Sequence, residues 1–249
     1  MGIGIFAYVF LRSPSTSGQT QESPKDTFKL VHFKALLTSP VIWLLAIANL
    51  LMVGSLEGFS DVWGVPYLVT AYGISKSDAA QLISFVFFGM LVGGPLLAMF
   101  SKKFGNYPVI AVCGFGMALL FAILLGIENY HWWLLASLFF TVGILCCYQV
   151  IVFAAGADLV AVGYLGVTIA FLNCINMLGG SFFHTCIGKL MDIFWTGGIA
   201  DEGIKLYRLG TYRWALIVIP ICASLGAMIS CWVGLKQSQP SGKPVATEQ

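Results

Sequence analysis

Six long apolar stretches constrain the fold of this chain more than any other feature of its sequence. Each is at least as long as the roughly 20 predominantly apolar residues that an α-helix needs to cross a bilayer. Soluble domains are roughly 45–50% apolar and about 25% charged, whereas this chain of 249 residues is 58% hydrophobic and 10% charged. The predicted fold class is therefore an all-α integral membrane protein with six transmembrane helices. The predicted spans are residues 41–69, 79–100, 107–127, 132–153, 164–193 and 214–235.

The segments outside these spans divide the chain into four predicted parts. Residues 2–11 are apolar but too short to cross a bilayer, and a positive charge follows them, whereas a signal peptide carries its charge first. We therefore interpret residues 1–12 as the end of a preceding transmembrane helix. The polar residues 13–39 are predicted to be a cytoplasmic linker. Residues 40–236 form the predicted six-helix domain, and residues 237–249 a cytoplasmic tail.

The distribution of lysine and arginine predicts how the chain crosses the membrane. These residues are enriched in cytoplasmic loops, and placing the linker in the cytoplasm puts eight of them inside and four outside. Both termini are therefore expected in the cytoplasm. The chain also has no N-x-[ST] glycosylation acceptor, which favours a bacterial inner membrane. The inside set is Arg12, Lys25, Lys29, Lys34, Lys102, Lys103, Lys236 and Lys243, and the outside set is Lys76, Lys205, Arg208 and Arg213.

The first span carries two acidic side chains. Ionisable groups within a membrane are costly, which makes them candidate functional groups. Glu57 and Asp61 lie four residues apart, so a helix places both on one face. Two carboxylates in a low-dielectric environment cannot both ionise at low cost, and one that changes its protonation state near neutral pH could carry a proton through a transport cycle. The alternative is that the helix leaves the membrane early and both groups are hydrated.

Further polar side chains occur in the first, fourth and fifth spans. His184 can bind or relay a proton near neutral pH, and Asn173 projects within about 20° of it at 100° per residue. Such a stripe could face a polar cavity. The alternative is interhelical hydrogen bonding, which is common for Asn and His in membranes. The candidate substrate-cavity residues are Asn49, Tyr148, Gln149, Asn173 and Asn176.

Two pairs of glycines predict close contacts between helices. Gly54 and Gly58 are separated by three residues, as are Gly89 and Gly93. This spacing places small residues on one side of a helix and lets a second backbone approach it. Such packing is compatible with moving helices and with a static bundle.

The sequence contains no motif of a known catalytic or cofactor-binding chemistry. It has no H-E-x-x-H, no G-x-S-x-G, no P-loop and no strand-linked G-x-G-x-x-G. Its His, Asp, Glu and Cys residues lack the spacing of a metal site, and its Lys and Arg residues do not cluster as nucleic-acid binding requires. We therefore expect no enzyme, no catalytic residue, no cofactor, no metal and no nucleic-acid partner.

Two stretches of the chain resemble the major facilitator superfamily of transporters. Residues 72–106 are similar to the family's helix 8 and its loop to helix 9, which often reads S-D-R-F-G-R-R. Here the loop reads SKKFGNY, with Lys102 at the acidic position, Lys103 and Gly105 matching the pattern, and Asn106 at the basic position after the glycine. The resemblance implies a conformational role for Lys102, Lys103 and Gly105.

The second stretch, residues 158–192, resembles helix 11 of the same family and the loop before it. Family members often show G-T-A-x-G-F-x-N, then G-G and G-x-L-x-D, and His184 stands where relatives often have Gln. Residues 59–68, FSDVWGVPYL, also resemble the end of helix 7. The matching residues are Gly166, Thr168, Ala170, Phe171, Asn173, Gly179, Gly180, Gly188, Leu190 and Asp192.

The resemblance implies that the six spans are helices 7–12, one half of a twelve-helix bundle whose substrate site lies between the halves at the midplane. It implies a secondary active transporter of a small polar solute, with the lipid bilayer as its surroundings. The ionisable side chains described above make proton coupling the expected mechanism, with Glu57, Asp61 and His184 as candidates. Such a half is expected to need an N-terminal six-helix half or a second copy. The alternative is a truncated, non-transporting fragment or an assembly subunit of a split transporter. A receptor-like or channel-like protein is less favoured, because neither a seventh full span nor an Arg-rich voltage sensor is present.

Overall fold

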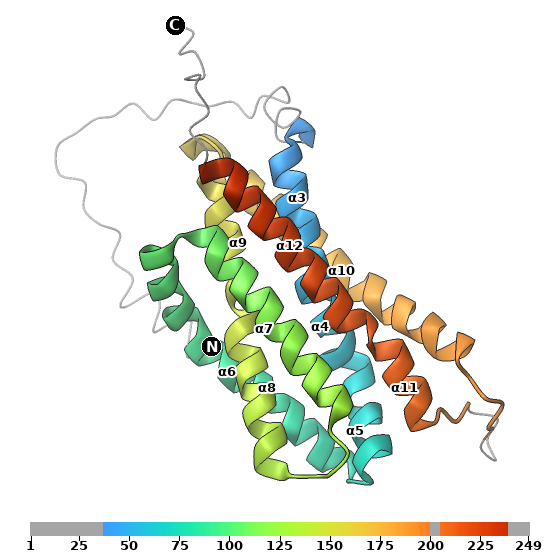
Figure 1. Ribbon diagram of the computed structural model, residues 1–249. Helices are drawn as coiled ribbons and strands as arrows, with labels where there is room; N and C mark the ends of the chain where they lie inside the picture. Colours follow the sequence, from blue (N-terminus) through green and yellow to red (C-terminus); the bar gives the residue numbers. More distant parts are fainter. Residues whose placement is uncertain (1–36, 200–204, 239–249) are drawn as a thin grey trace, which may run out of the picture. The chain divides into compact units, whose positions relative to one another are not determined.

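The predicted apolar stretches all form helices in the computed structural model, which describes residues 37–199 and 205–238 (Figure 1). Within these residues, six helical spans are long and apolar enough to cross a membrane, which confirms the predicted fold class. Residues 1–12, the predicted linker up to residue 36 and the tail after residue 238 lie outside the described part, so that division of the chain stays a prediction. The spans are Pro40–Tyr72, Lys76–Phe104, Asn106–Gly126, Trp132–Ala157, Val162–Ile193 and Leu209–Gln237.

The first span is a helix interrupted by two π-helical turns. Pro40, which has no N–H to leave unpaired at a first helical position, begins it. Gly73 ends it with a left-handed φ of 65°, which costs a glycine nothing. Single π turns of this kind often occur at functional sites. The elements in order are α3 (Pro40–Asn49), the π turn η1 (Leu50–Gly54), α4 (Ser55–Gly58), the π turn η2 (Phe59–Trp63) and α5 (Gly64–Tyr72).

The second and third spans are the continuous helices α6 (Lys76–Phe104) and α7 (Asn106–Gly126). Helix α6 starts three residues before the predicted span because Ser75 caps it, its Oγ accepting a hydrogen bond from the Asp78 N–H at 3.1 Å. Gly105 alone connects the two helices, with a φ of 88° that an L side chain rarely adopts.

Two of the remaining three spans are interrupted, and the other begins with a short 3₁₀ turn; the sequence pattern predicted none of these features. The fourth span breaks at Cys147, the fifth begins with the 3₁₀ turn η3 (Val162–Tyr164), and the sixth breaks at Ile217. Helices in membranes tolerate such local departures where neighbouring helices satisfy the backbone groups. The helices are α8 (Trp132–Cys146), α9 (Tyr148–Ala157), α10 (Leu165–Ile193), α11 (Leu209–Leu216) and α12 (Val218–Ser238).

Glycines set the closest helix contacts in the bundle. Helix α6 packs along α8, α12 packs along α7, and α10 packs against η1 and α4 of the first span (Figure 1). A Cβ at Gly89 would collide with the Phe140 carbonyl oxygen, and one at Gly54 would lie 2.8 Å from the Gly179 backbone. The two glycine pairs expected to admit a second backbone thus do so, one against α8 and the other against α10.

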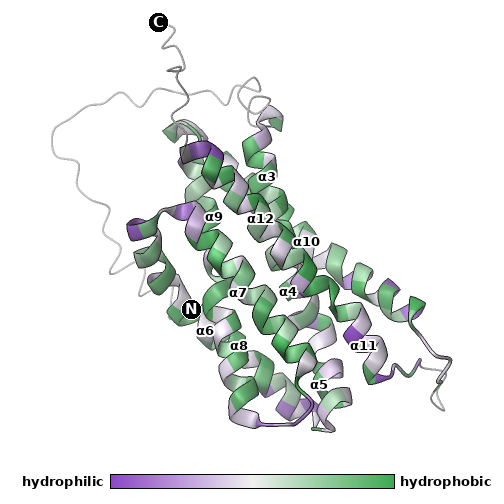
Figure 2. Ribbon diagram, viewed as in Figure 1, coloured by the Kyte–Doolittle hydropathy of each residue, from purple (hydrophilic) through white to green (hydrophobic). Residues whose placement is uncertain are grey.

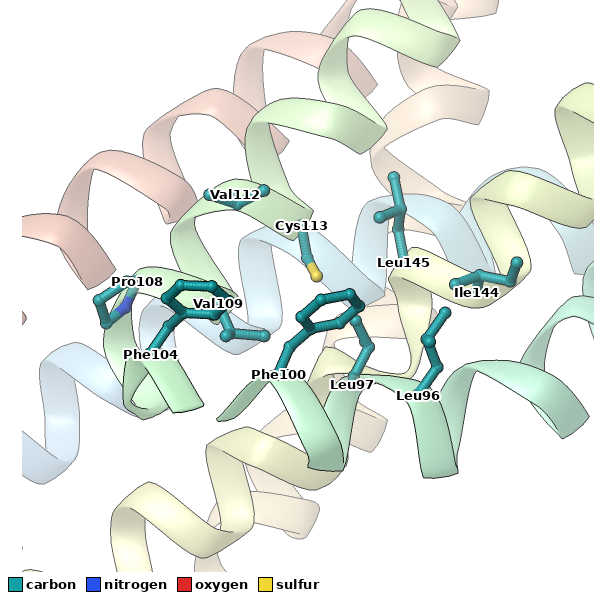
Figure 3. Close-up of a pocket in the computed structure, with 10 residues that line it drawn as sticks. All are labelled: Leu96, Leu97, Phe100, Phe104, Pro108, Val109, Val112, Cys113, Ile144 and Leu145. Atoms are coloured by element: carbon teal, nitrogen blue, oxygen red, sulfur yellow. The ribbon is translucent and has the colours of Figure 1, made fainter. Parts of the chain in front are cut away.

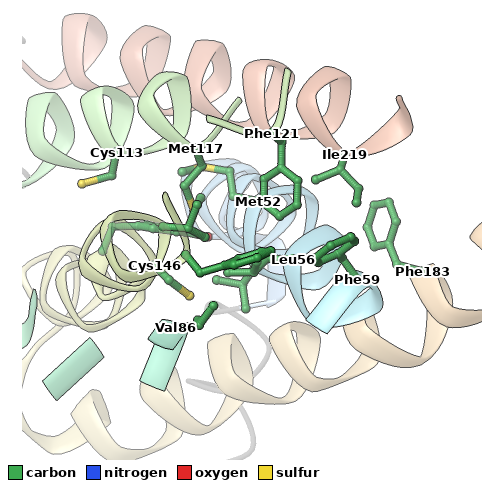
Figure 4. Close-up of a cluster of buried hydrophobic side chains, with 14 of the residues drawn as sticks. Met52, Leu56, Phe59, Val86, Cys113, Met117, Phe121, Cys146, Phe183 and Ile219 are labelled. Atoms are coloured by element: carbon green, nitrogen blue, oxygen red, sulfur yellow. The ribbon is translucent and has the colours of Figure 1, made fainter. Parts of the chain in front are cut away.

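The bundle core consists of large apolar side chains from most of the spans (Figure 4). The ring of Phe59 lies edge-on to that of Phe121 at 5.2 Å and stacks with that of Phe139 at 6.2 Å. Hydrophilic residues gather at the helix ends and connections, while the spans between them are mostly apolar (Figure 2). This distribution is that of a chain whose solvent is the bilayer.

The connection between α10 and α11 is attached to the end of α10. Lys205 Nζ and the Tyr207 hydroxyl each donate a hydrogen bond to Asp192 Oδ1 at 2.7 Å. Partial burial and the hydrogen bond to this carboxylate raise the pKa of Tyr207 to about 12. Tyr207 therefore remains a neutral donor at any physiological pH, and the attachment does not depend on its titration.

Candidate functional site

Three membrane spans meet at a chain of hydrogen-bonded polar side chains. Asn49 Nδ2 at the end of α3 donates to Asn176 Oδ1 on α10 at 3.1 Å. Asn176 Nδ2 donates in turn to Gln149 Oε1 on α9 at 3.5 Å. The Tyr148 hydroxyl donates to the backbone carbonyl of Asn49 at 3.4 Å. Four of the five predicted cavity residues therefore form one set, which we call the amide cluster: Asn49, Tyr148, Gln149 and Asn176.

The amide cluster is enclosed by the bundle. Asn49, Tyr148 and Asn176 are each 0% exposed, and Gln149 is half-buried. Within the described part of the chain, the enclosed Asn49 Oδ1 receives no hydrogen bond. A buried acceptor without a donor costs about 1–3 kcal/mol, so this oxygen is a source of local strain in the enclosed cluster.

Glu57 and Asp61 lie beside the amide cluster in a cavity of about 140 Å³. Ser60 and Gln149 also line it, and apolar side chains form the rest of its wall. The Glu57 carboxylate lies against Gly180 of α10, where a Cβ would be only 2.8 Å from Oε2. The glycine at position 180 therefore leaves the space that this carboxylate occupies.

His184 on α10 faces the second carboxylate of the first span. Its Nε2 lies 3.8 Å from Asp61 Oδ2, too far for a hydrogen bond but close enough for an ion pair when the ring is protonated. Within the described residues, this nitrogen is enclosed and has no hydrogen-bond partner. The Trp63 indole N–H donates to the His184 carbonyl at 3.3 Å and ties the two helices together at this level. We call Glu57, Asp61 and His184 the ionisable cluster.

Asn173 is the one predicted cavity residue that the structure does not bring into either cluster. It is exposed on α10, and its 11-residue separation from His184 corresponds to roughly 16 Å along a helix. The two side chains lie on the same face of α10, as predicted, but at different positions along the helix axis. Ser60, which lines the cavity and donates to the Leu56 carbonyl at 3.1 Å, was missed by the sequence reasoning. Its position between the two carboxylates was the available signal.

The predicted conformational loop lies at the connection of α6 and α7, away from both clusters. Lys102 and Lys103 are exposed at the end of α6, and Gly105 makes the turn. Asn106 hydrogen-bonds with Ser101, and its Nδ2 donates to Asp158 Oδ2 at 2.9 Å. A neutral amide thus connects this loop to the end of α9, at the position where the family pattern has a basic residue. Asp158 was also missed as a partner, although it directly follows the fourth span.

Replacing Asn176 tests whether the amide cluster stabilises the bundle. An Asn176→Leu substitution leaves Asn49 Nδ2 and Gln149 Oε1 without their partner, and we expect it to destabilise the protein by about 1–2 kcal/mol. The thermal midpoint of purified protein in detergent should fall by about 3 °C or more. The control is Asn173→Leu on the same helix, which should change the midpoint little. Equal effects of the two substitutions would contradict a role for the buried hydrogen bonds.

The fold and the two clusters define a multi-pass helical membrane protein with a polar site inside its apolar spans. Among the described residues, no three His, Cys, Asp or Glu side chains come together as a metal site would require. The chemistry that these clusters can perform is hydrogen bonding to a solute and binding or releasing protons.

Comparison with known proteins identifies the family. A sequence model of the Major Facilitator Superfamily matches residues 1–184 and 65–248. The chain therefore belongs to this superfamily of membrane transporters, as the resemblance of its helices predicted. No curated protein sequence matches the chain.

A solved structure shares the fold. It is a bacterial homolog of the human lysosomal transporter Spinster, in an inward-facing and unoccupied conformation, with a TM-score of 0.58 and 14% sequence identity. The match covers 94% of this chain and 56% of that one. The chain thus spans little more than half the length of the transporter it resembles. At this identity the similarity concerns the fold alone.

Proposed function

We propose that this chain is a secondary active transporter that moves a small polar solute together with protons. The observation that carries the proposal is the juxtaposition of the two clusters within the membrane spans. Glu57 and Gln149 line one cavity, and Gln149 is hydrogen-bonded to Asn176. A group that can bind a proton and a group that can bind a solute therefore lie side by side.

This juxtaposition supports coupling through charge. When Glu57 is ionised in the cavity, a proton or a cationic group of the solute can neutralise it, and ionisable groups at membrane depth are most stable when neutralised. Asp61 and His184 offer a second pair in which a proton on the imidazole creates an attraction at 3.8 Å. Proton binding and solute binding would then each change the stability of the same helix contacts between the first span and α10.

The solute is proposed to be neutral, zwitterionic or cationic. The described residues that line the cavity include two carboxylates and one amide but neither Lys nor Arg. An anion would meet repulsion there without a compensating positive charge. The Gln149 side chain and the Ser60 hydroxyl in the cavity wall favour a solute with hydrogen-bonding groups.

The test of this function is solute uptake into proteoliposomes that contain the purified chain. A panel of amino acids, sugars and nucleosides would be offered under an imposed proton gradient. We expect accumulation of at least one neutral or cationic solute, abolished when the gradient is collapsed. Uptake at the same level with and without a gradient would contradict proton coupling, and the absence of uptake by any solute would contradict transport by this chain alone.

The proposed membrane orientation has both termini in the cytoplasm of a bacterial inner membrane. The start of α3, the end of α12 and the α6–α7 connection lie at the same end of the bundle (Figure 1). Lys102, Lys103 and Lys236 are therefore at that end, and the eight-to-four excess of basic residues counted over the whole sequence supports a cytoplasmic position for it. We expect a fluorescent protein fused after Gln249 to fluoresce in bacterial cells and a phosphatase fused there to be inactive. The same fusions after Asn129 should give the reverse result, and an active phosphatase at the C-terminus would refute the orientation.

The length of the matching structure favours a second candidate, a subunit that completes a transporter with another six-helix chain or a second copy. The match uses 56% of that structure's chain, and superfamily members place the solute between two halves. In that case the chain alone would show no uptake, whereas co-reconstitution with the complementary half would restore it. Uptake by the chain alone, in a form shown to be monomeric, would rule out this candidate.

A further inference from the structure

A groove lined wholly by apolar side chains lies between α6, α7 and α8 (Figure 3). Its volume is about 480 Å³, within the range of about 300–1,000 Å³ that is typical of ligand sites. It shares no lining residue with the cavity of the ionisable cluster. A polar solute would leave its hydrogen-bonding groups unsatisfied there, so the groove suits an apolar ligand.

The groove is open to the surroundings of the spans. Phe100 and Phe104 on α6 are 44% and 56% exposed, and Val112 on α7 is 67% exposed. All three lie within segments long and apolar enough to cross a membrane. The exposed side chains of the groove therefore face the hydrocarbon of a bilayer, where acyl chains are the abundant apolar ligand.

One end of the groove carries a positive charge. Lys103 Nζ lies 5.2 Å from the ring centroid of Phe104, which lines the groove. At 100° per residue, Lys103 projects about 60° from Phe100, whereas Lys102 projects about 160° from it, on the opposite side of α6. Asp158, the acid that follows α9, accepts a hydrogen bond from Asn106, so its carboxylate already has a partner. Lys103 is therefore the basic side chain placed to meet a group that extends from the end of the groove.

We propose that this groove binds an anionic phospholipid, with one acyl chain among Leu96, Phe100, Val112 and Leu145 and its phosphate against Lys103. The lining provides apolar contact along the chain, and the lysine lies where the helix leaves the membrane, at the level of lipid headgroups. Basic residues in this position attract anionic lipids. The site is separate from the solute pathway proposed above, so either can fail without the other.

Native mass spectrometry of the purified full chain in detergent tests the site. Phosphatidylglycerol and phosphatidylcholine with identical acyl chains would be added at equal concentrations. We expect the wild-type chain to retain phosphatidylglycerol about fivefold more strongly. Lys103→Gln should remove this preference, while Lys102→Gln, its neighbour on the opposite side of the helix, should retain it.

A second pair of variants tests the groove itself. Val112→Trp places a large ring in the groove and should lower the retention of both lipids by about fivefold or more. Val150→Trp, at a residue of α9 that is 53% exposed, should leave lipid retention unchanged. Equal losses in Lys102→Gln and Lys103→Gln, or wild-type retention in a Val112→Trp protein, would overturn the proposal. A change in oligomeric state with Val112→Trp, without loss of lipid, would assign the groove to a second copy of the chain instead.

Discussion

Replacing Glu57 with Gln is expected to abolish proton-driven solute accumulation while leaving solute binding in place. The amide has nearly the shape of the carboxylate and can also hydrogen-bond, but it cannot gain or lose a proton near neutral pH. If Glu57 is the coupling group, gradient-driven uptake should fall by about two orders of magnitude, as on removal of a proton-transferring side chain from an enzyme. The measurement is uptake into proteoliposomes with and without an imposed proton gradient.

Solute exchange without a gradient separates loss of coupling from loss of folding. A Glu57→Gln protein that still exchanges labelled for unlabelled solute at the wild-type rate has an intact path and has lost only the proton step. The matched control is Glu128→Gln, because Glu128 is a 79% exposed acid that lies 3.9 Å from Arg213 in the connection after α7. Exposed pairs of this kind contribute little, so both activities should persist. Full gradient-driven accumulation in Glu57→Gln would remove this residue from the coupling mechanism.

The largest expected loss of stability follows from adding one methyl group to Gly89. A Cβ at this position would collide with the Phe140 carbonyl oxygen. A Cβ at the reciprocal glycine on α8, Gly143, would collide in the same way with the Val86 carbonyl oxygen. Backbone cannot give way as a flexible side chain can, so α6 and α8 would have to separate. We expect Gly89→Ala to destabilise the protein by about 3 kcal/mol, seen as a fall of about 5 °C or more in its thermal midpoint in detergent.

Gly94 on the same helix provides the control. A Cβ there would meet no atom within 4 Å, and alanine favours a helix interior over glycine by about 1 kcal/mol. Gly94→Ala should therefore leave the thermal midpoint unchanged or raise it. If the two substitutions lower the midpoint equally, the close contact of α6 with α8 would not explain the loss, because Gly94 has no such contact.

The positions of the spans were predictable because their length and apolarity are properties of single segments. All six predicted stretches are helical, and the cap at Ser75 and the turn at Gly105 follow from local chemistry. The meeting of Asn49 with Gln149 and Asn176 was not predictable in detail, because it depends on which helices become neighbours. The presence of these polar side chains at membrane depth suggested one shared cavity, but it did not show that they would bond to one another or that Asn173 would lie outside their cluster.

The interruptions of the helices could not be predicted from the sequence for a different reason. A π turn preserves the apolar character of a span and changes only its hydrogen-bond pattern, so the first span reads as one continuous helix. The spacing argument for Glu57 and Asp61 assumed regular α-helical geometry, yet Asp61 lies within the π turn Phe59–Trp63. Both side chains nevertheless line the same cavity.

The two π turns also make the length of the first span adjustable during evolution. A π turn holds one residue more than an α turn, so deleting one residue from Leu50–Gly54 could restore a regular helix without disturbing the apolar pattern. Deleting a residue from a regular helix rotates the flanking side chains by about 100° relative to one another, but here the π turn already absorbs the extra residue within one turn. Asn49 and Glu57 would therefore keep nearly their present relative orientation, and the amide cluster and the ionisable cluster would stay side by side. Homologues that lack one residue here should therefore present the same polar face, even where their alignment requires a gap.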